Sequence, residues 1–394
     1  MAAKKFEILV LNQISQVGLK RLPEKSYKVS KDSAHPDAIL VRSHDMHAMA
    51  IPDSVRAVGR AGAGTNNIPV KQMSGRGVPV FNAPGANANA VKELVLAGIL
   101  IAARNLAPAL GFVSGLSGDD KTLSEKVEAG KKAFAGMELP GHTLGVIGLG
   151  KIGSLVADAA IKLGMNVLGY DPEITVDAAW SLPSQVKKAH SIEEVLKSSH
   201  FITLHVPLLP VTRHLIDAKK LELAHTGAIL LNFSREEVVD AKAVAGALKD
   251  KKLGRYVTDF PAAALAGNPS VIALPHLGAS TREAEDNSAV MVVDQIRDYL
   301  EHGNIQNAVN FPDVVMGRES PYRMGVANAN VPNMVGQISG AMAKAGLNIH
   351  NMINRSKGEM AYTLVDVDSA VNGTLIGELA GIKGVLAVRY LPTS

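Results

Sequence analysis

The sequence predicts an α/β protein with two parallel-sheet domains, followed by a small C-terminal domain of βαββαβ order. Short apolar runs of strand length alternate with helical segments up to about residue 280. Many of these runs end in polar groups, as strands do at the carboxyl edge of a parallel sheet. After residue 320 the order of strands and helices changes. A chain of 394 residues has room for two or three such domains.

The composition excludes several classes of protein. Hydrophobic residues make up 47% of the chain, enough for a sizeable core, and the net charge of +4 is scattered without a basic tract, so nucleic-acid binding is not predicted. The absence of cysteine excludes disulfides and fits a cytoplasmic protein. The N-terminus lacks the apolar core of a signal peptide, and the longest charge-free apolar run, Leu94 to Ala103, is too short to span a bilayer. Dispersed histidines predict no metal site.

The first domain is predicted from strands at Phe6 to Leu11, Tyr27 to Val29, Ala38 to Val41 and Val55 to Val58. Polar groups follow three strand-like runs in this region: Arg42–Ser43–His44, Arg60 to Asn67, and Asn82 to Asn89. Arginines and glycine-rich loops at a sheet edge are suited to an anion, although each group also fits an ordinary surface loop. Ala88 to Leu106 is predicted to be one long helix leading to the second domain, and Gly115 to Lys132 a polar surface excursion.

The stretch from Thr143 to Asp171 has the full context of a dinucleotide-binding motif. A strand, Leu144 to Ile147, precedes Gly148, Gly150 and Gly153 in G-x-G-x-x-G order, a helix follows, and a second strand ends at Asp171. The glycines permit a tight turn, approach to a pyrophosphate and close packing of helix on strand. Asp171 would accept hydrogen bonds from the ribose hydroxyls and repel a 2′-phosphate. We therefore expect a Rossmann-like domain that binds NAD in preference to NADP.

Four later strand-like runs also end in residues suited to chemistry. These endings are His205–Val206–Pro207, Asn232–Phe233–Ser234–Arg235, Asp259–Phe260–Pro261 and Pro275–His276–Leu277–Gly278. The imidazole of His276 can take and return a proton near neutral pH, and Arg235 carries a permanent charge suited to a carboxylate or carbonyl oxygen. Either residue alone also fits a structural role. The argument for a site is that four strands of one predicted sheet end in such residues, which places them at the same sheet edge.

The last helix of this region is predicted from Thr281 to Leu300, and the segment after residue 320 reads as a ferredoxin-like unit. Its predicted strands are Met324 to Asn328, Asn348 to Asn354, Ala361 to Val367 and Val385 to Tyr390, and its helices are Met334 to Ala345 and Gly373 to Leu379. Exposed edges of such a sheet commonly pair with another subunit.

These motifs resemble those of the D-2-hydroxyacid dehydrogenases. The resemblance rests on GLGKIG with Asp171, HVP to TRH at His205 to His214, NFSR at Asn232, and PHLGAST at Pro275. VRSH at Val41, GAGTNNI at Gly62 and the terminal domain are most similar to the branch of the family that oxidises 3-phosphoglycerate. The resemblance implies a discontinuous substrate-binding domain (residues 1–95 and 280–310, Rossmann-like or flavodoxin-like), an NAD-binding domain (96–279) and an ACT-like regulatory domain (320–394).

The resemblance also implies residue roles. His276 would be the general acid/base and Arg235 would orient the substrate, while Arg42, Ser43, Arg60, Ala63 and Gly64 would bind it. The implied NAD-binding set is Gly148, Gly150, Lys151, Ile152, Gly153, Asp171, His205, Val206, Pro207, Thr212, Phe233, Ser234, Arg235, Asp259, His276, Gly278 and Ala279. The implied activity is the first step of L-serine biosynthesis, in a homodimer or homotetramer.

Two departures from the family pattern leave alternatives open. The family usually has a Glu a few residues after the position of Asp259, paired with the histidine, but this chain has Ala262, Ala263 and Ala264 there. Asp259, an acid from the helix at Glu283 and Glu285, or no acid at all would then serve His276. The serine-binding turn of the terminal domain is also altered to NVPN, which leaves as effector candidates Asn328, Asn330 and Asn348.

Two other functions remain as alternatives. One is a different 2-hydroxyacid dehydrogenase, such as a glyoxylate or hydroxypyruvate reductase. The other is a non-catalytic NAD-sensing regulator, which only the missing Glu favours.

Overall fold

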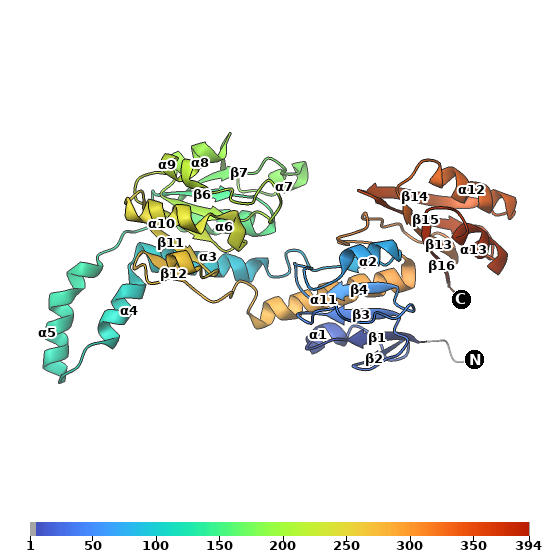
Figure 1. Cartoon of the computed structure of the whole chain (residues 1–394), viewed down its shortest axis with the longest axis horizontal. Helices are drawn as coiled ribbons and strands as arrows, with labels where there is room; N and C mark the ends of the chain where they lie inside the picture. The colour runs from blue at the N-terminus through green and yellow to red at the C-terminus, as the bar shows by residue number, and fades with distance from the viewer. Residues whose placement is uncertain (1–4, 394) are drawn as a thin grey trace. The chain divides into compact units, whose positions relative to one another are not determined.

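The computed structural model describes residues 5–393, and the chain divides into two compact units. Unit 1 comprises the residues up to Asn87 together with those from Arg282 onward, and unit 2 comprises Ala88–Thr281. Figure 1 labels the elements of both units along the chain. Because unit 1 is assembled from both ends of the chain, unit 2 is an insertion between its two segments.

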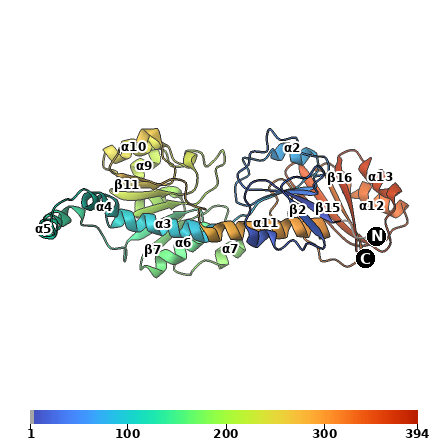
Figure 2. The same cartoon turned by 90° about the horizontal axis from the view of Figure 1, so that it is seen from below.

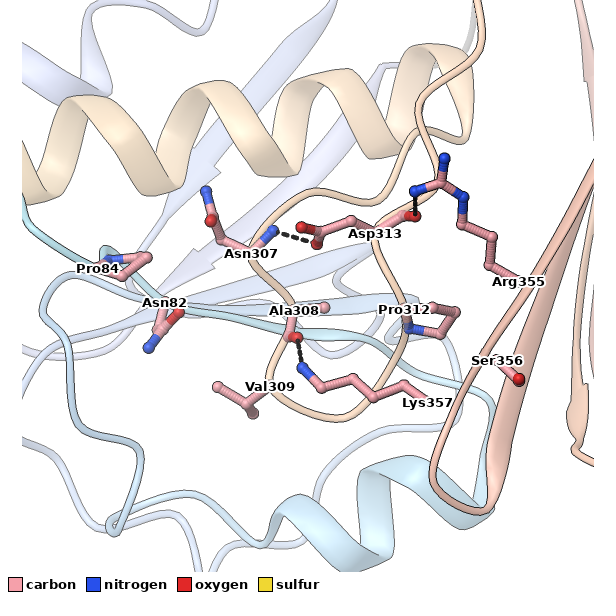
Figure 3. A pocket seen from close by; sticks show the side chains of 10 residues that line it. All are labelled: Asn82, Pro84, Asn307, Ala308, Val309, Pro312, Asp313, Arg355, Ser356 and Lys357. Atoms are coloured by element: carbon pink, nitrogen blue, oxygen red, sulfur yellow. Dashed lines mark hydrogen bonds between the residues drawn. The ribbon is translucent and has the colours of Figure 1, made fainter. Parts of the chain in front are cut away.

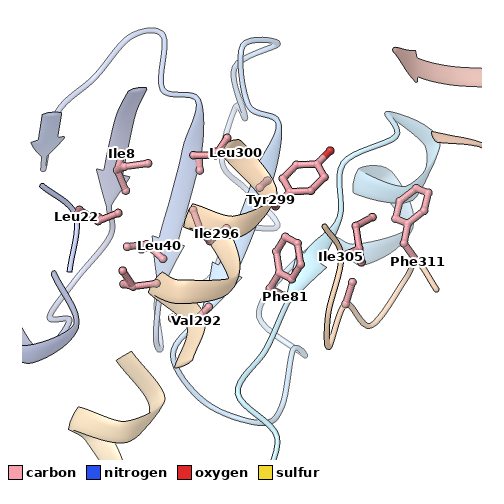
Figure 4. Close-up of a cluster of buried hydrophobic side chains, with 14 of the residues drawn as sticks. Ile8, Leu22, Leu40, Phe81, Val292, Ile296, Tyr299, Leu300, Ile305 and Phe311 are labelled. Carbon is pink, nitrogen blue, oxygen red and sulfur yellow. The ribbon is translucent and has the colours of Figure 1, made fainter. Parts of the chain in front are cut away.

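Unit 1 contains a five-stranded parallel sheet of order β2-β1-β3-β4-β5. Its elements are β1 (Phe6–Val10), α1 (Gln16–Leu19), β2 (Tyr27–Ser30), β3 (Ala38–Val41), β4 (Ala57–Arg60), α2 (Val70–Gly75), β5 (Val80–Phe81) and α11 (Arg282–His302). The strand predicted at Val55 begins instead at Ala57 and extends to Arg60. Helix α11 packs its apolar side, including Val292 and Ile296, against this sheet, as Figure 4 shows. The 21-residue helix therefore completes the domain that the N-terminal residues begin.

The C-terminal part of unit 1 is a four-stranded antiparallel sheet with two helices. Its strands follow the order β14-β15-β13-β16, and its elements are β13 (Tyr322–Ala329), α12 (Met334–Lys344), β14 (Ile349–Lys357), β15 (Met360–Val367), α13 (Gly373–Ala380) and β16 (Val385–Pro392). The element order is therefore βαββαβ. Tyr362 and Leu364 of β15 belong to the same core cluster as α11, which joins this sheet to the first one.

An arginine on each of two strands also ties the C-terminal sheet to the end of α11. Arg389 donates to the carbonyls of Tyr299 and Leu300 at 3.0 Å each, and Arg323 donates to that of His302 at 3.2 Å. Arg323 is fully buried and paired with Asp366, which keeps the pKa of Asp366 low despite the opposing effect of burial. These contacts satisfy carbonyls that the last turn of a helix leaves without intrahelical partners, and they place positive charge at its negative end.

Unit 2 contains a seven-stranded parallel sheet of order β12-β11-β10-β9-β6-β7-β8. Its strands are β6 (Thr143–Ile147), β7 (Asn166–Tyr170), β8 (Lys187–Lys188), β9 (Phe201–Leu204), β10 (Ala228–Asn232), β11 (Leu253–Thr258) and β12 (Val271–Ala273). Its helices are α3 (Ala88–Ala103), α4 (Leu106–Ser114), α5 (Asp120–Gly130), η1 (Lys131–Phe134), α6 (Lys151–Lys162), α7 (Val176–Trp180), α8 (Ile192–Ser198), α9 (Ala218–Leu223), η2 (Glu236–Val238), α10 (Ala241–Lys249) and η3 (Ala263–Leu265).

Helices cover both faces of this sheet. One core cluster joins α3 and α6 to the strands, and a second joins α8, α9 and α10, in agreement with the two helix layers of Figure 2. With both faces covered, the central strands are apolar along their whole length, and all residues of β9 and β10 are buried.

The long helix predicted from Ala88 to Leu106 is wrong at its C-terminal end. Helix α3 ends at Ala103, and Asn105 has a left-handed backbone with φ of 54° before α4 begins. Asn is one of the few residues that adopt this conformation readily. Its side chain also donates to the carbonyl of Ala135 and accepts from Arg255, which fixes the bend. Among the described residues no single helix is long and apolar enough to cross a membrane. Taken together, α3 and α4 reach the required length and apolar character, but the pair is bent by 68°.

Candidate active site

The glycine loop follows β6 and has the geometry that its sequence predicts. Gly148 has φ of 92°, and a Cβ there would lie 2.5 Å from the carbonyl oxygen of His205. A Cβ on Gly153 would lie 1.9 Å from the carbonyl oxygen of Gly148, so the start of α6 packs directly on the turn. A Cβ on Gly150 would meet nothing within 4 Å, so that side of the loop is open to a ligand.

The first turn of α6 points backbone N–H groups toward the open side of this loop. The first helical hydrogen bond there runs from the N–H of Ser154 to the carbonyl of Gly150, which leaves the N–H groups of Lys151, Ile152 and Gly153 without intrahelical partners. Such N–H groups, with the positive end of the helix dipole, suit a pyrophosphate. The residues present therefore fit a dinucleotide.

Asp171, at the end of β7, is held beside the glycine loop. Its Oδ2 accepts from the N–H of Leu149 at 2.8 Å and its Oδ1 from the N–H of Glu173 at 3.0 Å. Each oxygen of an ionised carboxylate has a further lone pair, so Asp171 retains the capacity to accept from ribose hydroxyls.

The candidate residues of unit 2 follow consecutive strands along one edge of its sheet. In spatial order His276 follows β12, Asp259 follows β11, Arg235 follows β10, His205 follows β9 and the glycine loop follows β6. All these strands are parallel, so their carboxyl ends lie at the same edge. Since neighbouring strands are about 4.8 Å apart, Arg235 and His276 follow strand ends about 10 Å apart. This edge therefore carries both a fixed cation and an imidazole.

Asn232 organises the turn that presents Arg235. Its Oδ1 accepts from the N–H and the hydroxyl of Ser234 at 3.1 and 2.8 Å, and its Nδ2 donates to the carbonyl of Arg235 at 2.9 Å. Asn232 is fully buried, while Arg235 is exposed and donates to the carbonyl of Ser234 at 2.7 Å. Phe233 is buried against Gly98 of α3, which anchors the same turn.

Asp259 lies against the segment that carries His276. Its Oδ2 accepts from the N–H of Gly278 at 3.2 Å, and its Oδ1 is buried without a hydrogen-bond partner in the described part of the chain. Burial raises the pKa of Asp259, while the positive charge of a protonated His276 acts to lower it. The His276 ring is exposed and contacts the ring of Phe260 edge-on at 4.9 Å between centroids.

The position of the usual family Glu falls at a short 3-10 turn, η3, which carries only alanines and a buried leucine, Leu265. Of the other acids considered for His276, Glu285 pairs with Arg42 at 2.7 Å within unit 1. Asp259 is the acid that bonds to the segment carrying His276, through the N–H of Gly278.

The remaining residues predicted to bind the cofactor border the loop after β9. The Nε2 of His205 lies 3.0 Å from the hydroxyl of Thr203, and its Nδ1 is buried without a partner among the described residues. Burial lowers the pKa of His205 to about 3, so the ring is neutral at physiological pH. Thr212 holds the loop closed by donating to the carbonyl of Pro207 at 2.6 Å and accepting from the N–H of Leu209 at 2.7 Å. Thr212 therefore shapes the loop.

In unit 1, Arg42 and Ser43 follow β3 and are positioned by Asn12, which follows β1. The side chain of Asn12 accepts from the N–H of Arg42 at 3.2 Å and donates to the hydroxyl of Ser43 at 2.7 Å. The guanidinium of Arg60, at the end of β4, donates to the carbonyl of Arg42 at 3.1 Å. Arg42 and its partner Glu285 both line a cavity of about 800 Å³ at this edge, together with Lys31 and His44.

The loop with Ala63 and Gly64 follows β4, and Asn82 contacts it. The amide of Asn82 donates to the carbonyl of Ala63 at 2.5 Å, and the N–H of Ala83 donates to the carbonyl of Gly62 at 3.0 Å. The predicted substrate residues of unit 1 thus share one edge of its sheet.

The three asparagines predicted as effector ligands do not form one group within the chain. Asn328 pairs with Ala361 near one end of the antiparallel sheet, whereas Asn348 directly precedes Ile349, which pairs with Val367 near the other end. Asn328 is buried, and Asn330 donates to the carbonyl of Gly358. Strand pairing explains the separation. Strands β13 and β14 are both antiparallel to β15 and therefore run in the same direction, and Asn328 is near the end of β13 whereas Asn348 precedes the start of β14.

Sequence reasoning placed Asn82 and Asn232 at strand ends without giving either a role, and it missed Asn12. The amides of all three bond to the backbone or hydroxyls of neighbouring loops. The available signal for Asn12 was its position directly after the predicted strand from Phe6 to Leu11.

Comparison with known proteins places this arrangement in a family. Residues 107–278 match the D-isomer specific 2-hydroxyacid dehydrogenase, NAD binding domain. The chain is 38% identical over 281 residues to a D-3-phosphoglycerate dehydrogenase of Methanocaldococcus jannaschii, covering 69% of this chain and 51% of that one. It is 34% identical over 350 residues to a D-3-phosphoglycerate dehydrogenase of Haemophilus influenzae, covering 85% of this chain and 81% of that one.

The solved structures agree on the fold. The NAD⁺-bound 3-phosphoglycerate dehydrogenase of Entamoeba histolytica superposes with a TM-score of 0.61 at 24% identity, over 78% of this chain and 99% of that one. The chain spans only about half the length of the Methanocaldococcus relative but most of the Haemophilus one. The chain belongs to the D-isomer specific 2-hydroxyacid dehydrogenase family, and unit 2 carries that family's NAD-binding domain.

Proposed function

We propose that this protein oxidises 3-phospho-D-glycerate to 3-phosphohydroxypyruvate with NAD, the first step of L-serine biosynthesis. The observation that carries the proposal is the order of residues along one sheet edge, where Arg235 and His276 follow strands of the sheet that also bears the glycine loop. The names of the relatives from Methanocaldococcus and Haemophilus support the choice of substrate.

Each residue at this edge has a distinct task in the proposed reaction. Bound NAD supplies an acceptor for the hydride from C2 of the substrate. The His276 imidazole removes the proton of the C2 hydroxyl, and the exposed Arg235 holds the carboxylate and polarises the forming carbonyl. Asp259 orients the His276 segment by accepting from the N–H of Gly278.

The residues of unit 1 bind the anionic ends of the substrate in this proposal. Arg42 and Ser43 take the phosphate or carboxylate, assisted by Arg60, and Ala63 and Gly64 offer backbone N–H groups. Arg42 is held by Glu285 at 2.7 Å, with side-chain exposures of 35% and 43%. An ion pair this exposed is worth about 0–1 kcal/mol, so a doubly charged phosphate can displace the carboxylate.

In this proposal the cofactor is held by the glycine loop and by the loops that follow the strands of unit 2. The N–H groups of Lys151 and Ile152 bind the pyrophosphate and Asp171 binds the adenosine ribose. Residues of the loops after the strands border the nicotinamide and its ribose: His205, Val206, Pro207, Thr212, Phe233, Ser234, Asp259, Gly278 and Ala279. The neutral His205 and the turn held by Asn232 give this side a fixed shape.

The experiment compares wild type with His276→Asn and Arg235→Gln, measuring both NAD binding and NADH formation from 3-phosphoglycerate. Both side chains are exposed, so the variants should fold. We expect NAD affinity within about threefold of wild type and, for His276→Asn, a loss of about 10²- to 10⁴-fold in kcat, as is usual for a general base. A wild-type protein that binds NAD but oxidises no 2-hydroxy acid would instead support the NAD-sensing alternative, which the alanines at Ala262 to Ala264 favour.

We also propose that the C-terminal βαββαβ part is an ACT-like domain that binds an amino-acid effector. Asn328 and Asn330 lie at one end of its sheet and Asn348 at the other, so a site using all three needs two copies of the chain. Titration of activity with L-serine tests this effector, and a flat response rejects it.

A homodimer through unit 2 is the proposed minimal assembly. Helix α4 has no buried residue, and its Leu110 and Val113 are 69% and 56% exposed. Figure 1 shows α4 and α5 extending away from the sheet of unit 2. Sedimentation of wild type and Leu110→Glu tests the contact, and a wild type that sediments as a monomer contradicts it.

A further inference from the structure

A second polar pocket of about 630 Å³ lies within unit 1, between the C-terminal antiparallel sheet and the connector that follows α11. Figure 3 shows its lining, with the side chains of Arg355 and Lys357 near the end of β14 pointing toward the connector segment from Asn307 to Asp313, and that of Ser356 between them pointing away. Asn82 and Pro84, from the loop after β5, form another wall. None of the functions assigned above uses this pocket.

The two cations in the pocket have only neutral partners among the described residues. Arg355 donates to the carbonyl of Asp313 at 3.3 Å, and Lys357 donates to that of Ala308 at 2.9 Å. Neither has a carboxylate within 4.0 Å in that part of the chain. The one carboxylate in the lining, that of Asp313, already accepts from the N–H of Asn307 at 2.8 Å.

We propose that this pocket binds a small organic anion that carries a phosphate or carboxylate group. Arg355 offers further N–H donors for a bidentate contact, and Lys357 adds a charged donor two residues along the same strand. The amides of Asn82 and Asn307, which also line the pocket, add neutral donors. The combination matches the oxygens and the charge of such a group.

The pocket is connected to the loop that we assign to the substrate. The N–H of Asn82 donates to the carbonyl of Asn307 at 3.3 Å, while its side chain donates to the carbonyl of Ala63 at 2.5 Å. Phe81 also forms a β-bridge with Ala308, which accepts from Lys357. An anion that draws Lys357 or Asn82 toward itself therefore changes the bonds that hold the Ala63 loop. This consequence for catalysis rests on the proposed function, whereas the binding does not.

The test is hydrogen–deuterium exchange of the full chain, with and without inorganic phosphate, in wild type and Arg355→Gln/Lys357→Gln. We expect phosphate to slow exchange in residues 303–315 and 350–360 of wild type, and this protection to disappear in the double variant. Lys383→Gln is the matched control, since Lys383 is an exposed lysine of the same sheet region outside the pocket. Pro84→Glu adds a negative charge at an exposed position of the lining without removing either contact to the connector, and it should also abolish the protection.

Three outcomes separate the binding site from the proposed function. Protection only around Arg42 and Ala63 overturns the second site and leaves the assigned substrate site standing. Protection at the pocket that persists in both Pro84→Glu and the double variant also overturns it. If protection at the pocket follows the predicted pattern, phosphate should change the KM for 3-phosphoglycerate at least about threefold more in wild type than in Pro84→Glu. An equal response in the two proteins rejects the connection to the Ala63 loop.

Discussion

The carboxylate of Asp259 accepts a hydrogen bond from the backbone N–H of Gly278 at 3.2 Å, two residues beyond His276. Its other oxygen is buried without a partner in the described residues. Although the chain lacks the usual family Glu, the carboxylate of Asp259 still contacts the segment that carries His276.

Asp259→Asn tests whether this carboxylate serves His276. The amide still accepts from the N–H of Gly278 but carries no charge, so it no longer stabilises the positive charge that develops on the imidazole during proton transfer. We expect kcat for oxidation of 3-phosphoglycerate to fall while the affinity for NAD stays within about threefold of wild type. An unchanged kcat would show that Asp259 acts only on the backbone.

Glu285→Gln tests the assignment of Arg42. The change removes the charge that holds Arg42, and an exposed pair of this kind is worth about 0–1 kcal/mol. We expect the KM for 3-phosphoglycerate to fall by up to about fivefold, with kcat nearly unchanged. Asp294→Asn, which breaks another exposed pair on α11, is the control and should leave KM unaltered. A KM that Glu285→Gln does not change removes Arg42 from the substrate site.

Gly153→Ala tests the packing of the glycine loop. Its Cβ would lie 1.9 Å from the carbonyl oxygen of Gly148, so the helix and turn must separate. We expect loss of NAD binding and a lower free energy of unfolding. Gly246→Ala in α10 is the matched control, because its Cβ would meet nothing within 4 Å. The free energy of unfolding of that variant should be about 0.5–1 kcal/mol higher than that of wild type, since alanine loses less backbone entropy than glycine when a helix forms. Unfolding in urea measures both, and a Gly153→Ala protein as stable as wild type contradicts the geometry.

His205→Gln tests the effect of a buried neutral imidazole on acid stability. Burial lowers the pKa of His205 to about 3, whereas in the unfolded chain a histidine titrates near pH 6.5. Between these values only the unfolded state takes up the proton, so stability falls as pH falls through this range. At pH 5 the loss is about 2 kcal/mol relative to pH 7.5. The free energy of unfolding of His205→Gln should fall by about that much less over the same interval, and equal losses in the two proteins would contradict the prediction.

The sequence predicted the strands and their shared edges because the signals for them are local. These signals are the spacing of apolar residues and the glycine or polar residues that end each run. Thr143 to Asp171 carries the strand, turn, helix and acid in one stretch, and the structure repeats that order. The bend at Asn105 was missed because its cause is distant in sequence, lying in contacts with Ala135 and Arg255. The helix α5 was missed because Leu123 and Val127 are its only large apolar residues and none of its residues is buried, so the apolar stripe was too short to mark it.

Among the site residues, too, those that belong to local motifs were predicted and those that depend on distant contacts were not. Arg235, His276 and the glycines belong to motifs that sequence alone identifies. The roles of Asn12 and Asn82 depend on which strands are neighbours, since Asn12 reaches the loop after β3 and Asn82 the loop after β4. The separation of Asn348 from Asn328 likewise follows from the antiparallel register, which no short motif contains.

The most direct test of the central claim is the ratio of kcat/KM for 3-phosphoglycerate to that for D-glycerate, measured with NAD under the same conditions. The two substrates differ only in the phosphate that the residues of unit 1 are proposed to bind. The account predicts a ratio of at least about 10², since losing the charge-assisted hydrogen bonds to the phosphate costs about 3 kcal/mol or more. A ratio near one, with either substrate oxidised efficiently, would contradict it.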